Sequence, residues 1–211
     1  MNALISSRLG RITALTLAAL AFTMPAQADY LWLQREGGQV KVFAGEVRKP
    51  QAQLPALVDA KPLLPGGRTL PMDIAADHFS FALAGAGDAR FSATRAGSDG
   101  VLTYYQARFG RAETEAVNDL ELVPTEPDGK TYRLIFKGRP VAASQVNVDT
   151  SEGWRRVLTP AKDGTVSFTP SFPGLYVLEV TARVNNGSVT LEGKKYDDVR
   201  HTATLSFEVS R

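Results

Sequence analysis

The segment ATLSFEV (residues 203–209), close to the end of the chain, alternates apolar and polar side chains. Successive side chains of an extended strand point to opposite sides, so its apolar residues share one face. These residues are Ala203, Leu205, Phe207 and Val209. The same period of two appears in three other segments: HFSFAL (78–83), TYRLIFK (131–137) and TVSFT (165–169). This alternation predicts strands that bury one face and expose the other to solvent.

Working outward from these segments, the chain contains further short stretches of strand-forming composition. They are residues 30–34, 39–44, 90–95, 101–109, 143–149, 154–159 and 174–184. Turn-forming pairs separate many of them, namely Asp128-Gly129, Asp163-Gly164 and Asn186-Gly187. Helix signals are restricted to 52–60, which prolines interrupt, and to one turn within 112–120. We therefore predict an all-β protein built of sandwiches rather than of alternating strands and helices.

The first 28 residues have the pattern of a secretory signal peptide. Arg8 and Arg11 precede an apolar run, ITALTLAALAF (12–22), and the small residues Ala26 and Ala28 follow it. The run is shorter than the roughly 20 apolar residues that a membrane-spanning helix needs. We predict cleavage after Ala28, export to the periplasm and no membrane span in the mature chain.

Charge and composition exclude several classes of function. The full chain has 24 Lys and Arg against 22 Asp and Glu, and loss of Arg8 and Arg11 leaves 22 of each. A nucleic-acid-binding protein normally carries a basic excess, so we predict no nucleic-acid partner. The absence of cysteine excludes disulfides, thiolate metal sites and cysteine nucleophiles. No nucleophile elbow, zinc-protease motif or phosphate-binding loop is present, so we predict a protein that is not an enzyme.

An acidic, turn-prone stretch at Pro124–Gly129 predicts a domain boundary. We place an N-terminal β domain at 29–124 and a C-terminal sandwich at 125–211, and we expect the two modules to pack together. Tyr176 follows Pro173-Gly174 at the start of a predicted strand. We expect its hydroxyl to bond back to the preceding loop, as in the tyrosine corner of immunoglobulin-like (Ig-like) sandwiches.

A resemblance to a known family rests mainly on the C-terminal half. The segments that carry it are ADYLWLQ (28–34), TYYQARFG (103–110), LELVP (120–124), GRPVAASQVNV (138–148), KDGTVSFTPSFPGLYVLEV (162–180) and KYDDVRHTATLSFEV (195–209). They resemble a family of exported proteins with a domain of unknown function, described as periplasmic components of nickel or cobalt uptake. More loosely, they are similar to transthyretin-like and Ig-like modules. The resemblance implies an Ig-like or transthyretin-like C-terminal sandwich and a non-enzymatic accessory role beside a membrane transporter or an outer-membrane receptor.

The family's link to nickel and cobalt directs attention to the histidines. After Ala28 the chain has only His78 and His201, and Asp77 and Asp197 lie close to them in sequence. These four residues are our candidate metal ligands, provided that the fold brings them together, and we predict no resident cofactor. Asp197 and His201 lie about 13 Å apart along a straight strand, too far to share one ion. The alternative is that both histidines only bond to nearby carboxylates or backbone at the ends of strands.

The family pattern also differs from this chain at the mature start. Where the family often has a histidine, this chain has Asp29 and Tyr30, so one nitrogen ligand is missing. We therefore predict no tight nickel site in the isolated protein.

The alternative function is a carbohydrate- or protein-binding adhesion module of the cell envelope. Glycan binding needs aromatic side chains exposed on a sheet face, and the candidates are Trp32, Tyr104, Tyr105 and Trp154. Adjacent residues of a strand face opposite sides, so one tyrosine of the Tyr104-Tyr105 pair is expected to be buried and the other exposed. Arg155 and Arg156 form a small basic spot that could bind an acidic partner.

Overall fold

The computed structural model describes residues 29–184 and 187–210. Over these residues the protein is all-β, as predicted, and the helical structure within them is one 3₁₀ turn, η1 (Pro65–Gly67). The predicted signal peptide (1–28), and Asn186 of a predicted turn, lie outside the described residues. The described part of the chain contains no helix long and apolar enough to cross a membrane.

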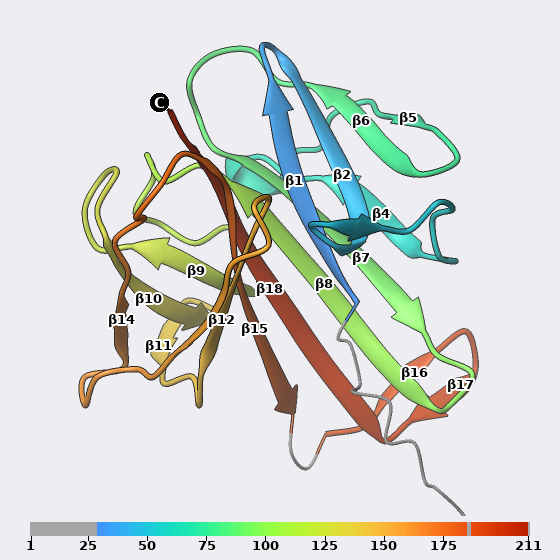
Figure 1. The fold of residues 1–211 in the computed structure, drawn as a ribbon. Coiled ribbons are helices and arrows are strands. Elements are labelled where there is room, and N and C mark those ends of the chain that lie inside the picture. The colour runs from blue at the N-terminus through green and yellow to red at the C-terminus, as the bar shows by residue number, and fades with distance from the viewer. Residues whose placement is uncertain (1–28, 185–186, 211) are drawn as a thin grey trace, which may run out of the picture.

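A seven-stranded sheet runs through the whole molecule (Figure 1). In spatial order its strands are β13 (Arg155–Leu158), β12 (Val146–Thr150), β15 (Gly174–Val184), β18 (Asp198–Val209), β8 (Val101–Phe109), β7 (Ala89–Ala96) and β4 (Val58–Pro62). The last strand, β18, pairs in parallel with β8, and every other neighbouring pair is antiparallel. Strands from both halves of the sequence therefore form one continuous sheet.

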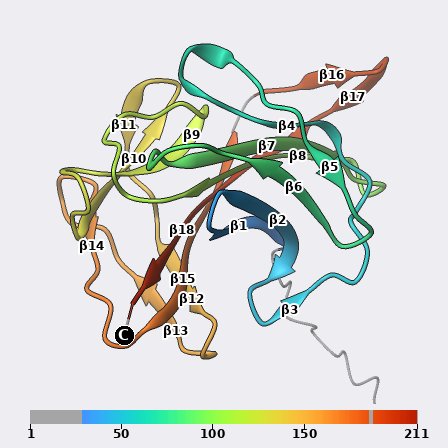
Figure 2. The same ribbon diagram turned by 90° about the horizontal axis from the view of Figure 1, so that it is seen from above.

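Two smaller sheets pack against this central sheet (Figures 1 and 2). The N-terminal small sheet contains β1 (Tyr30–Glu36), β2 (Gln39–Glu46), β3 (Lys49–Pro50), β5 (Asp73–Ile74) and β6 (His78–Ala82). The C-terminal small sheet contains β9 (Leu120–Pro124), β10 (Thr131–Phe136), β11 (Arg139–Val141) and β14 (Thr165–Ser167). A separate hairpin joins β16 (Val189–Leu191) to β17 (Lys194–Tyr196). The result is two packed β-sandwiches that share the central sheet, and β9 pairs with β10 across the predicted boundary.

The two sandwiches have separate apolar cores on opposite faces of the central sheet. In the C-terminal core, Leu205 and Phe207 of β18 pack with residues of the C-terminal small sheet such as Tyr132. In the N-terminal core, Phe91 of β7 packs with residues of β1, β2 and β6, such as Phe79. The residues predicted to face inward at 79, 81, 132, 134, 166 and 168 are all buried.

The polar side of β18 does not face solvent, which differs from the prediction of one exposed face. Thr202, Thr204 and Ser206 are each less than 5% exposed, because β1 lies across this side of the strand. The hydroxyl of Thr204 donates to the carbonyl oxygen of Leu31 at 2.6 Å, and the backbone N–H of Leu33 donates to Ser206 Oγ at 3.3 Å. These hydroxyls bond backbone groups on the edge of β1 that β2 does not pair, so the buried polar groups are satisfied.

The predicted turns and helical segments agree with the structure only in part. The two-residue turns at Lys137-Gly138 and Glu192-Gly193 have positive φ at both residues, which is the geometry of type I′ hairpins. The Asp163-Gly164 turn lies where predicted, with a Gly164 φ of 78°. Residues 52–60 form loop and the start of β4 instead of a helical turn, and 112–119 form a loop.

The predicted tyrosine corner is present. The hydroxyl of Tyr176, near the start of β15, donates to the carbonyl oxygen of Phe172 at 2.8 Å. It also accepts a hydrogen bond from the Phe172 backbone N–H at 3.2 Å. Tyr176 is fully buried, so these two bonds fix the loop that enters β15.

Candidate functional site: a charged cleft between two hairpins

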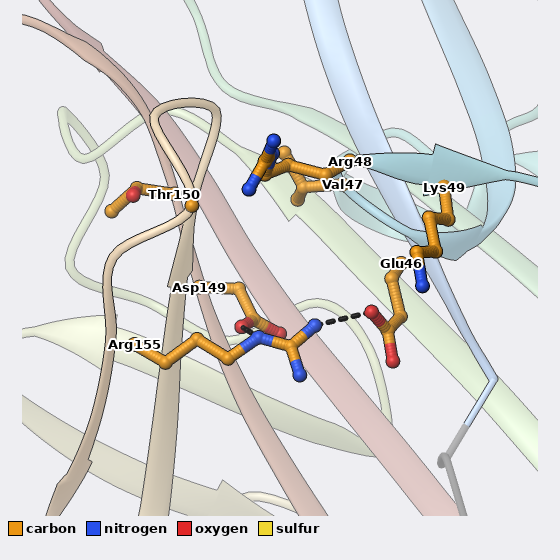
Figure 3. A pocket seen from close by; sticks show the side chains of 8 residues that line it. Glu46, Val47, Arg48, Lys49, Asp149, Thr150 and Arg155 are labelled. Atoms are coloured by element: carbon orange, nitrogen blue, oxygen red, sulfur yellow. Dashed lines mark hydrogen bonds and ion pairs between the residues drawn. The ribbon is translucent and has the colours of Figure 1, made fainter.

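A cleft of about 260 Å³ lies where a turn of the N-terminal sandwich meets a hairpin of the C-terminal one (Figure 3). One wall is the β2–β3 turn, and the other is the β12–β13 hairpin. The lining residues are Glu46, Val47, Arg48, Lys49, Asp149, Thr150, Gly153 and Arg155. Five of these eight side chains are charged, with one positive charge in excess, so the cleft is an electrostatic rather than an apolar feature.

Arg155 spans the cleft and connects its two walls. Its Nε lies 2.8 Å from Asp149 Oδ1 on the same hairpin, and its Nη2 forms an ion pair with Glu46 of the opposite wall. Figure 3 shows the guanidinium group between the two carboxylates. The hydrogen bond to Glu46 is the main reason that the pKa of Arg155 is raised. The guanidinium therefore stays charged and bridges the two walls, although the side chain is 56% exposed.

Tyr30 of β1 forms hydrogen bonds with both walls of the cleft. Its hydroxyl donates to Asp149 Oδ2 at 2.8 Å and accepts the backbone N–H of Val47 at 3.3 Å. Burial, with help from the nearby Asp149 carboxylate, raises the pKa of the Tyr30 hydroxyl. The hydroxyl remains protonated and links β1, the β2–β3 turn and β12.

Arg48 and Lys49 supply the cationic character of the cleft. Both side chains are exposed, and neither forms an ion pair with another residue that the structure describes. The guanidinium of Arg48 lies over Gly153, where a Cβ atom would come within 2.2 Å of Arg48 Nη1. Gly153 also has a φ of 82°, which side-chain-bearing residues rarely adopt. The hairpin therefore needs glycine at this position for its turn, whereas the end of the flexible Arg48 side chain could move aside for a Cβ atom.

Of the predicted metal ligands, the structure brings together Asp77 and His78. Asp77 Oδ1 lies 2.7 Å from His78 Nδ1, and this hydrogen bond lowers the pKa of the Asp77 carboxyl. His78 is at the start of β6, beside the ring of Phe43. The pair is the local contact that we considered as the alternative to metal binding.

His201 and Asp197 lie in different surroundings. His201 is 5% exposed, stacks on Tyr104 at 4.9 Å and meets the edge of Phe136 at 5.1 Å. Its Nδ1 lies 3.4 Å from Gln106 Oε1, and burial lowers the pKa of its imidazole. The Asp197 side chain is 75% exposed and pairs with a lysine, Lys195. Within residues 29–184 and 187–210, no group of three or more His, Asp or Glu side chains is arranged to hold a metal ion.

The aromatic candidates for glycan binding divide into buried and exposed residues. Trp32 and Tyr105 are 4% and 5% exposed and belong to the cores. Tyr104 is half-buried against His201, so the predicted opposite facing of the two tyrosines is correct. Trp154 is 36% exposed and covers the C-terminal core, with its ring 6.1 Å from that of Phe168.

Sequence reasoning found only one residue of the charged cleft. Arg155 was expected to contribute to a basic spot, but Arg156 points to the other side of β13 and does not line the cleft. Asp149 lies about 100 residues after Glu46 and Arg48, and no motif connects the two segments. The charged run Glu46-Val47-Arg48-Lys49 between two strands was the one available signal.

A scan against protein-family models and a search of curated proteins found no match to this chain.

Proposed function

We propose that this protein is an exported, non-enzymatic binding or accessory protein, and that it holds an acidic segment of a partner protein in the charged cleft. The observation that carries the proposal is the charge distribution of the cleft. Glu46 and Asp149 neutralise Arg155, whereas Arg48 and Lys49 on the opposite wall are exposed and have no described ion-pair partner. A carboxylate that enters the cleft meets two cations that no described carboxylate neutralises, so the electrostatic attraction is not spent on an internal ion pair.

The resemblance described above suggests which partner this is. Proteins of that family are described as periplasmic components of nickel or cobalt uptake, so we propose a membrane transporter or an outer-membrane receptor. An acidic loop of such a partner fits a cleft with an excess of positive charge. In this scheme the protein assists uptake and does not carry the metal itself.

The test uses a fluorescent hexaglutamate peptide as a minimal acidic segment. Fluorescence anisotropy should show saturable binding that weakens as salt is added, because exposed charges are screened. The double variant Arg48→Gln/Lys49→Gln should bind at least about tenfold more weakly, equivalent to about 1.4 kcal/mol. A matched double variant, Lys130→Gln/Arg133→Gln, removes two exposed cations of the C-terminal small sheet and should bind normally. Equal binding by the wild type and the Arg48/Lys49 variant contradicts the proposal.

Calorimetric titration with Ni²⁺ and Co²⁺ distinguishes an accessory role from direct metal carriage. We expect no binding tighter than about micromolar, or about −8 kcal/mol. Stoichiometric nanomolar binding that is lost in His201→Ala or His78→Ala would identify the protein as a metal carrier.

A further inference from the structure

The central sheet extends past β1 at one end, and this part of its face is open. Figure 1 shows the starts of β8 and β18 and the ends of β7 and β15 projecting beyond the small sheets. A pocket of about 370 Å³ lies here, on the side of the sheet that β1 covers further along. It is separate from the charged cleft and shares no residue with it.

Three arginines and a threonine lie in one row across four neighbouring strands of this end. The pairing register places Arg183 of β15 opposite Arg200 of β18, Arg200 opposite Thr103 of β8, and Thr103 opposite Arg95 of β7. Paired residues of adjacent strands point to the same face, and like charges directly opposite each other are destabilising. A row of this kind is stabilised by anions.

The carboxylates of the protein lie at unequal distances from these three arginines. Asp198 Oδ2 accepts from Arg183 at 3.0 Å and from Arg200 at 2.8 Å, so one carboxylate serves two arginines. The nearest described carboxylate to Arg95 is that of Asp29, at 3.7 Å, and the Arg95 side chain is 42% exposed. Arg95 also bonds the Tyr105 hydroxyl, and a second carboxylate, that of Asp99, lines the pocket. The remaining guanidinium N–H donors of Arg95 face the pocket.

The next row of the same face presents hydrogen-bond acceptors. Thr181 Oγ1 donates to the carboxylate of Glu179 at 2.6 Å, which uses its only hydroxyl hydrogen. The 2.9 Å contact between Thr181 Oγ1 and Thr202 Oγ1 must then have Thr202 as its donor. Both hydroxyl hydrogens are consumed. Thr202 is 4% exposed, whereas Thr181 is exposed and keeps an oxygen lone pair that can accept from a ligand.

We propose that this pocket binds a small hydroxylated acid, namely a sugar acid or a sugar phosphate. The oxyanion of the ligand pairs with Arg95, and its hydroxyl groups donate to the acceptor oxygens of the exposed Thr181 and of Asp29. Charge-assisted hydrogen bonds from a guanidinium to an oxyanion are among the strong ones, whereas the hydroxyl contacts select for a polyol. The pocket volume is in the range of small-molecule sites. This site is independent of the cleft and extends the proposed function to a second ligand.

The experiment titrates the purified protein with glucuronate, glucose 6-phosphate, glucose and inorganic phosphate, followed by calorimetry. We expect at least one of the two hydroxylated acids to bind at least tenfold more tightly than both glucose and phosphate. Arg95→Gln should weaken the binding of that acid at least tenfold. Thr181→Val keeps the shape of the side chain. It should weaken the binding of the hydroxylated acid but leave the weak binding of phosphate unchanged. Arg68→Gln, a loss of one exposed arginine in the loop after η1, is the matched control and should change nothing.

The results separate this proposal from the one for the cleft. Preference for glucuronate or for glucose 6-phosphate identifies the oxyanion as carboxylate or phosphate. Binding of glucose as tight as that of the acids overturns the role of Arg95, and no saturable binding of any probe overturns the site. Affinity for the acids that is unchanged in both Arg95→Gln and Thr181→Val also overturns it. Circular dichroism melts confirm that the variants are folded, and none of these substitutions touches the hexaglutamate cleft.

Discussion

One face of the central sheet is apolar over half its width and charged over the other half. A single row across the strands shows the change, since Leu178 of β15 pairs with Leu205 of β18, Leu205 with Arg108 of β8, and Arg108 with Arg90 of β7. All four side chains are buried, and the two arginines are at most 1% exposed. The leucines pack under the C-terminal small sheet, whereas the arginines lie beneath β9 and the loop that precedes it.

The charged half is a hydrogen-bonded network of two arginines and three carboxylates. Glu121 Oε1 accepts from Arg90 at 2.9 Å and from Arg108 at 2.8 Å, and Glu113 Oε2 accepts from Arg90 at 2.5 Å. Arg108 also pairs with Asp88, whose carboxylate accepts backbone N–H groups of the 112–119 loop. Glu113, whose side chain is 35% exposed, lies at the edge of this network. Removing an apolar side chain costs its packing, whereas removing one charge leaves another buried without a partner.

The largest effect should come from breaking the network. Arg108→Met keeps much of the side-chain volume but leaves Asp88 and Glu121, which are 5% and 1% exposed, short of a cation. We expect the free energy of unfolding to fall by about 3–5 kcal/mol in urea denaturation. The control Arg133→Met, at an exposed position of β10, should change it by less than about 0.5 kcal/mol. A loss below about 1 kcal/mol for Arg108→Met would mean that the charged half contributes less to stability than the apolar half.

A somewhat smaller loss is expected in the apolar half. Phe168 is 4% exposed and packs between Trp154 and Tyr176 at the rim of the C-terminal core. Phe168→Ala should cost about 3 kcal/mol, because Trp154 can partly close the cavity. The exposed neighbour Thr169 faces away, so Thr169→Ala should cost well under 1 kcal/mol. Similar urea midpoints for these two variants would show that the assigned strand facing is wrong.

The tyrosine corner tests the contribution of one polar group inside the apolar half. Tyr176→Phe removes the hydroxyl that bonds both backbone groups of Phe172 while keeping the ring stacked on Phe207. We expect a loss of about 1 kcal/mol, the usual value for a hydrogen bond. Thermal melts of this variant should keep a single cooperative transition. A cost above about 3 kcal/mol would imply that the corner holds more of the fold than its own loop.

The smallest effect is a dependence of stability on pH at His201, whose ring lies between Tyr104 and Phe136 on this same face. Burial lowers the folded-state pKa of this imidazole from its usual value of 6.5; Asp119 opposes this shift and Lys137 adds to it. As the pH falls below about 6.5, the unfolded chain binds a proton more readily than the folded one. The contribution of His201 to stability is complete above that pH and is lost as the pH falls through the folded-state pKa.

Urea denaturation between pH 7.5 and 5 measures this loss, which cannot exceed about 1.4 kcal/mol per pH unit for one group. His201→Leu should flatten the profile in this range. An unchanged slope in His201→Leu would mean that other groups set the pH dependence.

Much of the local structure could be predicted from the sequence because strand periodicity depends on neighbouring residues. The strands at 101–109 and 174–184 have the predicted bounds, and the inward-facing aromatic residues are buried as expected. The tyrosine corner also follows from a local pattern, since Tyr176 and its loop partner are only four residues apart. Signals of this kind need no knowledge of what packs on the strand.

The candidate sites could not be predicted in the same way, because their residues meet only through long-range pairing. Arg155 joins Glu46 across 109 residues, and no spacing rule connects two hairpins of different sheets. The arginine row needs the register of β15, β18, β8 and β7, and a shift of one residue would turn its side chains to the other face.

By itself, the sequence determined the all-β class, most strand positions and which side chains face inward, since these depend on the period of two and on turn chemistry. Only the tertiary structure decided that β18 pairs in parallel with β8 and that the polar side of β18 is covered by β1. The burial of Arg90 and Arg108 in a charged network also depends on the tertiary structure, because charged residues in a sequence are ordinarily expected at the surface. The physical reason is that alternation specifies two faces of a strand, whereas what covers each face depends on segments that are distant in the chain.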